Sequence, residues 1–153
     1  MIKSGLLISN LLLACVVFYT PFSNAQLYIG TVCLNSTVLE RETGAVSPET
    51  FLVKYDVVFL GGSSYSISGH VDIPEQPFIF TGYGNLIGSE LYMNVTTTQS
   101  HPDKWQDTGI NQTQLNLATM TGSWYEIGND FNTQSKTWDK RYTAGTVAKT
   151  SCL

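Results

Sequence analysis

Basic side chains are scarce in this sequence. Only 8 of the 153 residues are Lys or Arg, against 12 Asp and Glu, and no run of basic residues occurs. Nucleic acids and anionic membrane surfaces are bound by clustered positive charge, so this charge balance argues against either as a partner. The length suits one domain built around one hydrophobic core.

Recognisable catalytic and cofactor motifs are missing as well. The sequence has 2 histidines, His70 and His101, and neither belongs to a metal-binding or nucleophile motif. His70 and Asp72 share one face of an expected strand, but a zinc site needs three or four ligands. No Gly-x-Ser-x-Gly elbow and no glycine-rich phosphate loop occurs. We therefore expect no metal, no cofactor and no enzymatic activity.

No hydrophobic run is long enough to cross a membrane as a helix, which takes about 20 apolar residues. The N-terminal run over 6–17 is shorter, and Lys3 precedes it. Ser23-Asn24-Ala25 supplies the small residues of a signal peptidase site. This pattern predicts a cleaved signal peptide over 1–25 and a single secreted or periplasmic domain over 26–153.

Cysteine is used sparingly, with 3 residues in the whole sequence. Cys15 lies within the expected signal peptide. In the alternative interpretation it anchors a bacterial lipoprotein, because Leu12-Leu13-Ala14-Cys15 resembles a lipobox. After cleavage only Cys33 and Cys152 remain, and two cysteines in an exported chain allow a single disulfide. A Cys33–Cys152 bridge would close nearly the whole mature domain into one loop.

Helical periodicity is also absent, and apolar residues alternate with polar ones as in half-buried strands. Two segments show this most clearly, 51–60 and 64–71. Their apolar faces carry Phe51, Val53, Tyr55, Val57, Phe59, Tyr65, Ile67, Gly69 and Val71. Further strands are expected over 26–34 and 137–152.

One hairpin can be checked for internal consistency. Segments 78–87 and 90–99 are separated by Gly88-Ser89, which suits a type II′ two-residue turn. That turn pairs Ile87 with Glu90 and fixes the rest of the register. The apolar residues of both strands then share one face without adjustment; they are Phe78, Phe80, Gly82, Gly84, Leu86, Leu91, Met93 and Val95.

These strands predict an all-β fold, a small antiparallel meander barrel of about seven or eight strands. In a closed meander the first strand pairs with the last, and the Cys33–Cys152 disulfide would join these terminal strands. A two-sheet β-sandwich is the alternative. Insertion into a membrane is not expected, because the second face of segment 64–71 is too polar to meet lipid; it carries Ser64, Ser66, Ser68 and His70.

The segment MTGSWYEIG, residues 120–128, resembles the Gly-x-Trp opening motif of lipocalins, small barrels that carry apolar ligands. That motif belongs to a first strand, whereas only residues 129–153 remain after it here, so the resemblance is to a type of strand. Gly69 and Gly82 are set in similar strands, which also resemble those of avidin-like barrels. Glycine on an inner face relieves crowding where a sheet coils sharply.

The alternation breaks just before this segment, because Leu117 is out of phase with Met120. We expect a β-bulge near Ala118 and Thr119, which exchanges the two faces by adding one residue. Tyr125 then faces outward together with Ile127. The residues expected to face inward are Leu115, Leu117, Met120, Gly122 and Trp124.

Large side chains on the expected inner faces are candidates to line a ligand cavity. The alternative is that they fill the core, because the interior of a small barrel is about wide enough for side chains alone. The candidates are Tyr65, Phe78, Phe80, Met93 and Trp124. Trp105 joins them as a separate candidate, because it lies in a polar segment, 100–112, that is expected to form a loop at a barrel end or against a partner.

The sequence therefore predicts a secreted, non-catalytic binding module. Its partner would be a small apolar or aromatic ligand in the barrel, or a protein on its loops. The alternatives are a protease inhibitor that presents the segment 100–109, and a barrel-type enzyme with Tyr65, Tyr92 or Glu126 as acid or base. Glycosylation matters only in a eukaryotic source, and the sequons begin at Asn35, Asn94 and Asn111.

Overall fold

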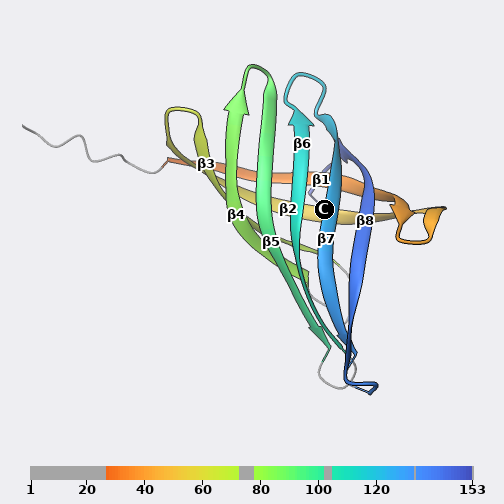
Figure 1. Ribbon diagram of the computed structural model, residues 1–153. Helices are drawn as coiled ribbons and strands as arrows, with labels where there is room; N and C mark the ends of the chain where they lie inside the picture. Colours follow the sequence, from red (N-terminus) through yellow and green to blue (C-terminus); the bar gives the residue numbers. More distant parts are fainter. Residues whose placement is uncertain (1–26, 73–77, 102–104, 133, 153) are drawn as a thin grey trace, which may run out of the picture.

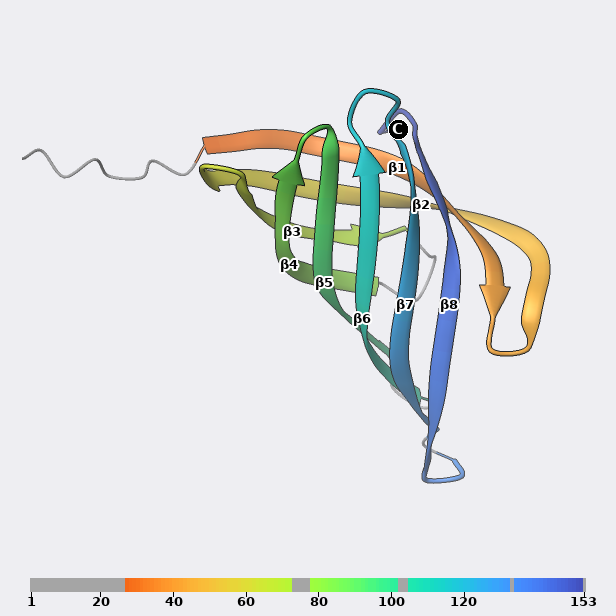
Figure 2. The ribbon, with the colours of Figure 1, turned by 45° about the horizontal axis from the view of Figure 1, so that its top comes forward.

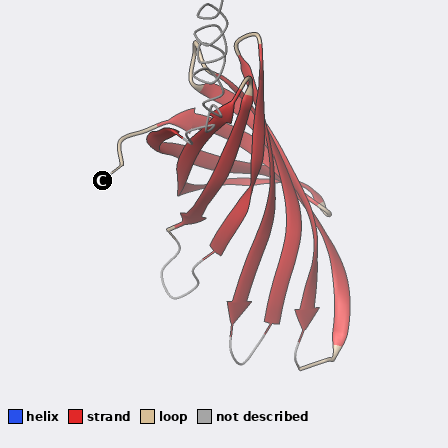
Figure 3. Cartoon of the chain, turned by 90° about the vertical axis from the view of Figure 1, so that its left-hand side faces the viewer, coloured by secondary structure: helices blue, strands red, loops and turns tan. Residues whose placement is uncertain are grey.

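The computed structural model describes residues 27–72, 78–101, 105–132 and 134–152. Within these ranges the chain forms eight β-strands and no helix, as Figure 3 shows. The strands are β1 (Leu27–Arg41), β2 (Gly44–Gly61), β3 (Ser64–Val71), β4 (Phe78–Ile87), β5 (Glu90–His101), β6 (Trp105–Asn116), β7 (Thr121–Asn132) and β8 (Thr137–Lys149). The expected all-β fold is confirmed.

The sheet closes on itself. Each strand pairs antiparallel with its neighbour in sequence, and β8 pairs with β1. The β1–β8 ladder runs from Leu34 opposite Lys149 to Arg41 opposite Thr143. This closure confirms the meander barrel and excludes the two-sheet sandwich. The long β1–β2 hairpin projects beyond the other strands (Figures 1 and 2).

The two ends of the barrel are packed differently. We call the end with the β2–β3, β4–β5 and β6–β7 turns the packed end, and the opposite end, with the β1–β2 and β7–β8 turns, the open end (Figure 1). Inward apolar side chains fill the packed end. They include Leu34, Val57, Ile67, Leu91, Met93, Leu115 and Val147, all less than a tenth exposed.

The register predicted for the β4–β5 hairpin is confirmed. Ile87 pairs with Glu90 and Gly84 with Met93, as the two-residue turn requires. Gly88 has a φ of 62°, which suits the first central position of a type II′ turn. The turn residues therefore determine the register along the whole hairpin.

Inward glycines lie where neighbouring backbones come close. A Cβ atom on Gly69 would lie 1.9 Å from the carbonyl oxygen of Lys54, and one on Gly122 would lie 2.0 Å from that of Gln114. No side chain fits at such distances. The expectation that these glycines relieve crowding on the inner face is confirmed.

The expected β-bulge near Ala118 and Thr119 is wrong, because residues 117–120 form the turn between β6 and β7. Asn116 builds this turn: its Oδ1 accepts the N–H groups of Ala118 at 2.9 Å and of Thr119 at 3.0 Å. Leu117 is consequently 39% exposed rather than internal. The other predicted orientations are confirmed. Leu115 and Trp124 are buried, and Met120 packs on the core. Tyr125 and Ile127 are exposed.

The same turn recurs between β7 and β8. Asn132 Oδ1 accepts the N–H groups of Gln134 at 2.9 Å and of Ser135 at 3.1 Å. The last turn residue has a positive φ in both cases, 55° for Met120 and 61° for Lys136. A Thr begins the next strand each time. Both ends of β7 are therefore defined by one local motif, Asn-x-x-Ser/Thr-x-Thr.

The predicted Cys33–Cys152 disulfide is present, with 5.3 Å between the two Cα atoms. It joins β1 to the segment that follows β8, where the N–H of Thr150 also donates to the carbonyl of Cys33 at 3.0 Å. Such a bridge is typical of proteins in oxidising compartments outside the cytoplasm. The expected signal peptide over 1–25 and Cys15 lie outside the described residues.

In the described part of the chain, no helix is long and apolar enough to cross a membrane.

Replacing Cys33 by Ser should lower the free energy of unfolding by about 2–5 kcal/mol, because the unfolded chain then loses the constraint of its long covalent loop. Denaturant titration without reductant measures the loss. The Cys152→Ser variant and the double variant should lose the same amount. A double variant markedly less stable than either single one would contradict a simple cross-link.

Candidate functional site

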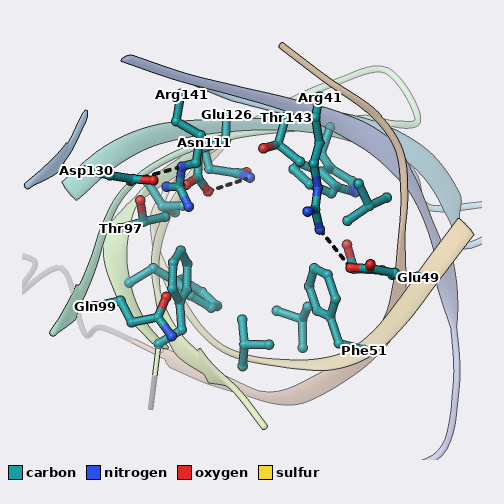
Figure 4. A pocket seen from close by; sticks show the side chains of 18 of the residues that line it. Arg41, Glu49, Phe51, Thr97, Gln99, Asn111, Glu126, Asp130, Arg141 and Thr143 are labelled. Atoms are coloured by element: carbon teal, nitrogen blue, oxygen red, sulfur yellow. Dashed lines mark hydrogen bonds and ion pairs between the residues drawn. The ribbon is translucent and has the colours of Figure 1, made fainter. Parts of the chain in front are cut away.

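The open end of the barrel holds a cavity of about 470 Å³, and side chains from all eight strands line it. Figure 4 looks into this space. Charged and amide side chains gather on one side of the opening, where Arg141, Glu126, Asn111 and Asp130 lie together. Arg41 and Glu49 face each other on another side.

An aromatic wall covers much of the remaining lining, formed by Phe51, Tyr55, Phe78, Phe80 and Trp124. Tyr55 packs on Phe80 with ring centroids 4.9 Å apart, and Phe51 meets Trp124 edge-on at 6.5 Å. Burial raises the pKa of Tyr55 to about 12, so its phenol stays protonated at neutral pH. The cavity thus combines an apolar wall with a polar one.

The structure brings together only some of the residues selected from the sequence. Phe80 and Trp124 line the cavity, whereas Met93 belongs to the packed end and Tyr65 packs on Phe59 at 5.5 Å. Trp105 is not in a loop, because it begins β6 and pairs with His101 and Asn132. Its side chain lies outside the described part of the structure.

Arg141 of β8 is the centre of the polar wall. It forms a bidentate pair with Asp107, with Nη1 2.5 Å from Oδ2 and Nη2 donating to Oδ1 at 2.7 Å. Nη2 also donates to Glu126 Oε1, and Nε lies 3.6 Å from Asp130 Oδ1. The side chains of Asp107 and Glu126 are only 2% and 7% exposed. Three carboxylates therefore share one guanidinium.

Two glycines make room for this cluster. Gly109 and Gly128 pair across β6 and β7, and Gly128 pairs with Arg141 on its other side. A Cβ atom on Gly128 would lie 3.2 Å from Nη2 of Arg141, and one on Gly109 would lie 3.1 Å from Oε1 of Glu126. The guanidinium and the carboxylate thus occupy space that larger residues at these positions would fill.

The cluster carries more negative charge than one guanidinium balances. Burial raises the pKa of Asp107 to about 7; Arg141 opposes this shift, while Asp130 and Glu126 add to it. Burial likewise raises the pKa of Glu126, against the opposing effect of Arg141. Asp107 therefore gains or loses its proton near neutral pH.

Trp124 has an unsatisfied polar atom. Its side chain is buried, and the indole Nε1–H has no hydrogen-bond partner. The nitrogen lies 3.0 Å from the position that a Cβ atom on Gly145 would take, so it lies close to the inner face of β8. A buried donor without a partner costs free energy, so this position of the indole is held by the packing of its ring.

The sequon positions differ in the folded barrel. Asn111 faces inward, where its Nδ2 donates to Glu126 Oε2 at 3.4 Å and its Oδ1 accepts from Thr113 at 2.9 Å. A glycan on Asn111 is incompatible with this barrel. Asn35 is exposed and Asn94 is half-buried.

Among the described residues, no group of three or more His, Cys, Asp or Glu side chains is arranged to hold a metal ion. His70 and Asp72 lie at the surface, with His70 Nε2 3.2 Å from Asp72 Oδ1. Asp72 Oδ2 also lies 2.7 Å from Lys54 Nζ. These contacts form a surface ion-pair group.

Sequence reasoning selected Glu126 but missed Arg141 and Asp107. Asp107, Gly109 and Asn111 alternate on one face of β6, the same period-two signal that identified the other strands. This period-two signal is hidden because the polar composition of segment 100–112 favours a loop. Phe51 and Tyr55 were assigned to an inner face, but their position along the barrel axis was not predicted.

No protein family, curated protein or solved structure matches the chain.

The free energy of unfolding should decrease as the pH rises from about 5 to about 8. The pKa values of Asp107 and Glu126 are raised in the folded state. The stabilising contribution of both groups is therefore complete below the unfolded pKa of about 4. That of Asp107 is lost as the pH rises through about 7, at about 1.4 kcal/mol for each unit of pKa difference.

Denaturant titrations at a series of pH values measure this dependence. The Asp107→Asn variant should show a weaker pH dependence of the free energy of unfolding. The outer-face variant Asp56→Asn should show the same dependence as the native protein. Stability that increases between pH 5 and 8 would contradict the charge imbalance.

Trp124→Ala should destabilise the protein by about 3 kcal/mol, the lower end for truncation of a buried large aromatic residue. The ring packs on the core but also borders a space that already exists, so little new cavity surface is created. Denaturant titration measures the loss. Trp138→Ala is the matched control, because Trp138 is 59% exposed and should change stability by less than about 1 kcal/mol. A loss well above 5 kcal/mol would show that Trp124 belongs to the core alone.

Proposed function

We propose that this protein is an exported, non-catalytic binding protein that holds a small molecule with an apolar or aromatic body in its open-end cavity. One observation carries the proposal: the packed end is filled by side chains, whereas the other end leaves about 470 Å³ open. The interior of an eight-stranded barrel can be filled by side chains or can hold one small ligand. An unfilled end of this size favours the ligand.

The composition of the lining supports the same function. Ligand pockets usually have volumes of about 300–1,000 Å³ and combine apolar walls with a few convergent polar groups. Here Phe51 and Phe80 belong to the apolar wall, while Asn111 and Glu126 converge from the polar one. The Cys33–Cys152 disulfide supports export, because such bridges persist in oxidising compartments.

Acid–base catalysis in the barrel has less support. Tyr92 is 38% exposed on the outer face, and Tyr65 packs at the packed end. Glu126 does line the cavity with a raised pKa, but Arg141 and Asn111 both donate to its carboxylate. Both oxygens of this carboxylate are therefore already hydrogen-bonded within the barrel.

Protease inhibition through the segment 100–109 also has less support than expected. Ser100 and His101 belong to β5, and β6 begins at Trp105, so most of this segment is strand rather than an extended binding loop. Residues 102–104 lie outside the described part of the chain.

A side chain that fills the cavity should abolish ligand binding. Thr143 lines the cavity from β8, whereas Thr146 is exposed on the outer face of the same strand. We expect N-phenyl-1-naphthylamine, a neutral probe that fluoresces in apolar surroundings, to bind the native protein in a 1:1 ratio. Thr143→Trp should weaken this binding by about tenfold or more, and Thr146→Trp should not change it.

Circular dichroism and thermal unfolding would confirm that both variants are folded. A native protein that does not bind the probe, or equal binding by both variants, would argue against a ligand in this cavity.

A further inference from the structure

We infer that the ligand of this cavity is a small organic cation, an ammonium group carried on an apolar or aromatic body. The ammonium would lie beside Glu126 and Asp130, and the body would contact the wall that includes Phe51 and Phe80. This inference rests on the proposed function, because it names the ligand chemistry of the same cavity.

Carboxylates outnumber cationic groups around the cavity. Arg41 and Glu49 form an ion pair, with Nη2 2.7 Å from Oε2, so their charges cancel. What remains in the lining is one guanidinium, on Arg141, and three carboxyl groups, on Glu42, Glu126 and Asp130. Asp107 and Asp139 add two more carboxyl groups in the adjoining hollow, which also includes Asp130 and Arg141. Charges in a partly enclosed space are screened less than in bulk water. A cation that enters the cavity is therefore attracted, and an anion is repelled.

Arg141 is not available to bind an anionic ligand. Both of its terminal nitrogens contact Asp107 or Glu126, and its Nε faces Asp130 at 3.6 Å. An anion would have to displace a carboxylate that is only 2% or 7% exposed and leave its charge buried without a partner, which is strongly unfavourable. Arg141 instead holds the acidic groups in place.

Asp130 is the carboxylate best placed to receive a new cation. Its side chain is 41% exposed, and its 3.6 Å contact with Arg141 is the longest in the cluster. Figure 4 shows Asp130 beside Arg141 and Glu126 at the edge of the opening. Burial and the neighbouring carboxylates raise the pKa of Asp107, so added positive charge would be stabilised here.

The rest of the lining fits the same kind of molecule. Aromatic faces attract cations and pack against flat apolar bodies. Trp124 adds a further aromatic ring to this lining. Trp124 and Glu126 lie two residues apart on one face of β7. A ligand that spans both would meet an indole ring and a carboxylate from one strand.

Three indoles that share one body test the inference: tryptamine, a cation; tryptophol, which is neutral; and indole-3-acetate, an anion. Calorimetric titration of the native protein at pH 8 gives their affinities. Tryptamine remains protonated at this pH, because aliphatic amines have pKa values near 10. We expect tryptamine to bind at least about tenfold more tightly than tryptophol, and indole-3-acetate to bind most weakly.

Two variants locate the charge that is responsible. Asp130→Asn and Glu126→Gln should each reduce the affinity for tryptamine by about fivefold or more and leave that for tryptophol unchanged. Unchanged tryptophol binding would also show that the variant cavity is intact. Asp56→Asn, which removes the same charge from the outer face, is the matched control and should leave all affinities unchanged.

The possible results separate the two proposals. Equal affinities for tryptamine and tryptophol, or a preference for indole-3-acetate, would overturn the cationic ligand and leave the binding cavity standing. Binding of N-phenyl-1-naphthylamine without binding of any indole would likewise overturn the cationic ligand and leave the binding cavity standing. If neither the indoles nor that probe binds, both proposals fail. A tryptamine preference that survives both Asp130→Asn and Glu126→Gln would overturn the assigned position of the ammonium.

Discussion

Closure of the sheet is the constraint on which the rest of this structure depends. Because β8 pairs with β1, every inward side chain faces one shared interior of fixed width. The period-two pattern of each strand then decides what that interior contains. Apolar residues such as Leu91 and Leu115 fill one end, while Glu126 and Arg141 are brought together at the other. The chemistry of the cavity is thus a direct result of strand register.

A charged group inside a barrel requires compensation, since an ion removed from water is costly unless it is paired. In the Arg141 cluster the guanidinium is paired with Asp107 of β6 and Glu126 of β7. The Gly109–Gly128 pair leaves space for these side chains. Compensation is incomplete, because three carboxylates meet one guanidinium. This imbalance distinguishes the site from a purely structural ion pair and connects the fold to the binding chemistry proposed above.

Local patterns in the sequence predicted much of the fold. The β4–β5 register followed from Gly88-Ser89, and the disulfide followed from the number of cysteines and the predicted signal peptide, since each depends on few residues. The turn at Asn116 was not predicted because no Gly follows Asn116 to mark a two-residue hairpin turn; its hydrogen bond from the N–H of Ala118 is the contact typical of an Asn turn. The residues that line the cavity were predicted only in part. The tilt of the strands sets the position of each inward residue along the barrel axis, and the sequence pattern does not give this tilt. For the same reason, the pairing of Asp107 with Arg141, 34 residues apart, could not be derived from spacing.

The position of the disulfide implies that the barrel does not open uniformly. Cys33 precedes the fully buried Leu34, so the covalent link and the apolar core stabilise the same end. The open end is held by backbone ladders and ion pairs, and residues 47–50 near the tip of the β1–β2 hairpin are all exposed. Local opening therefore costs least around the cavity, and amide hydrogens there should exchange with solvent well before those at the packed end. For the ligand proposed above, such fluctuations of the strand tips would widen the way into the cavity while the packed end stays folded.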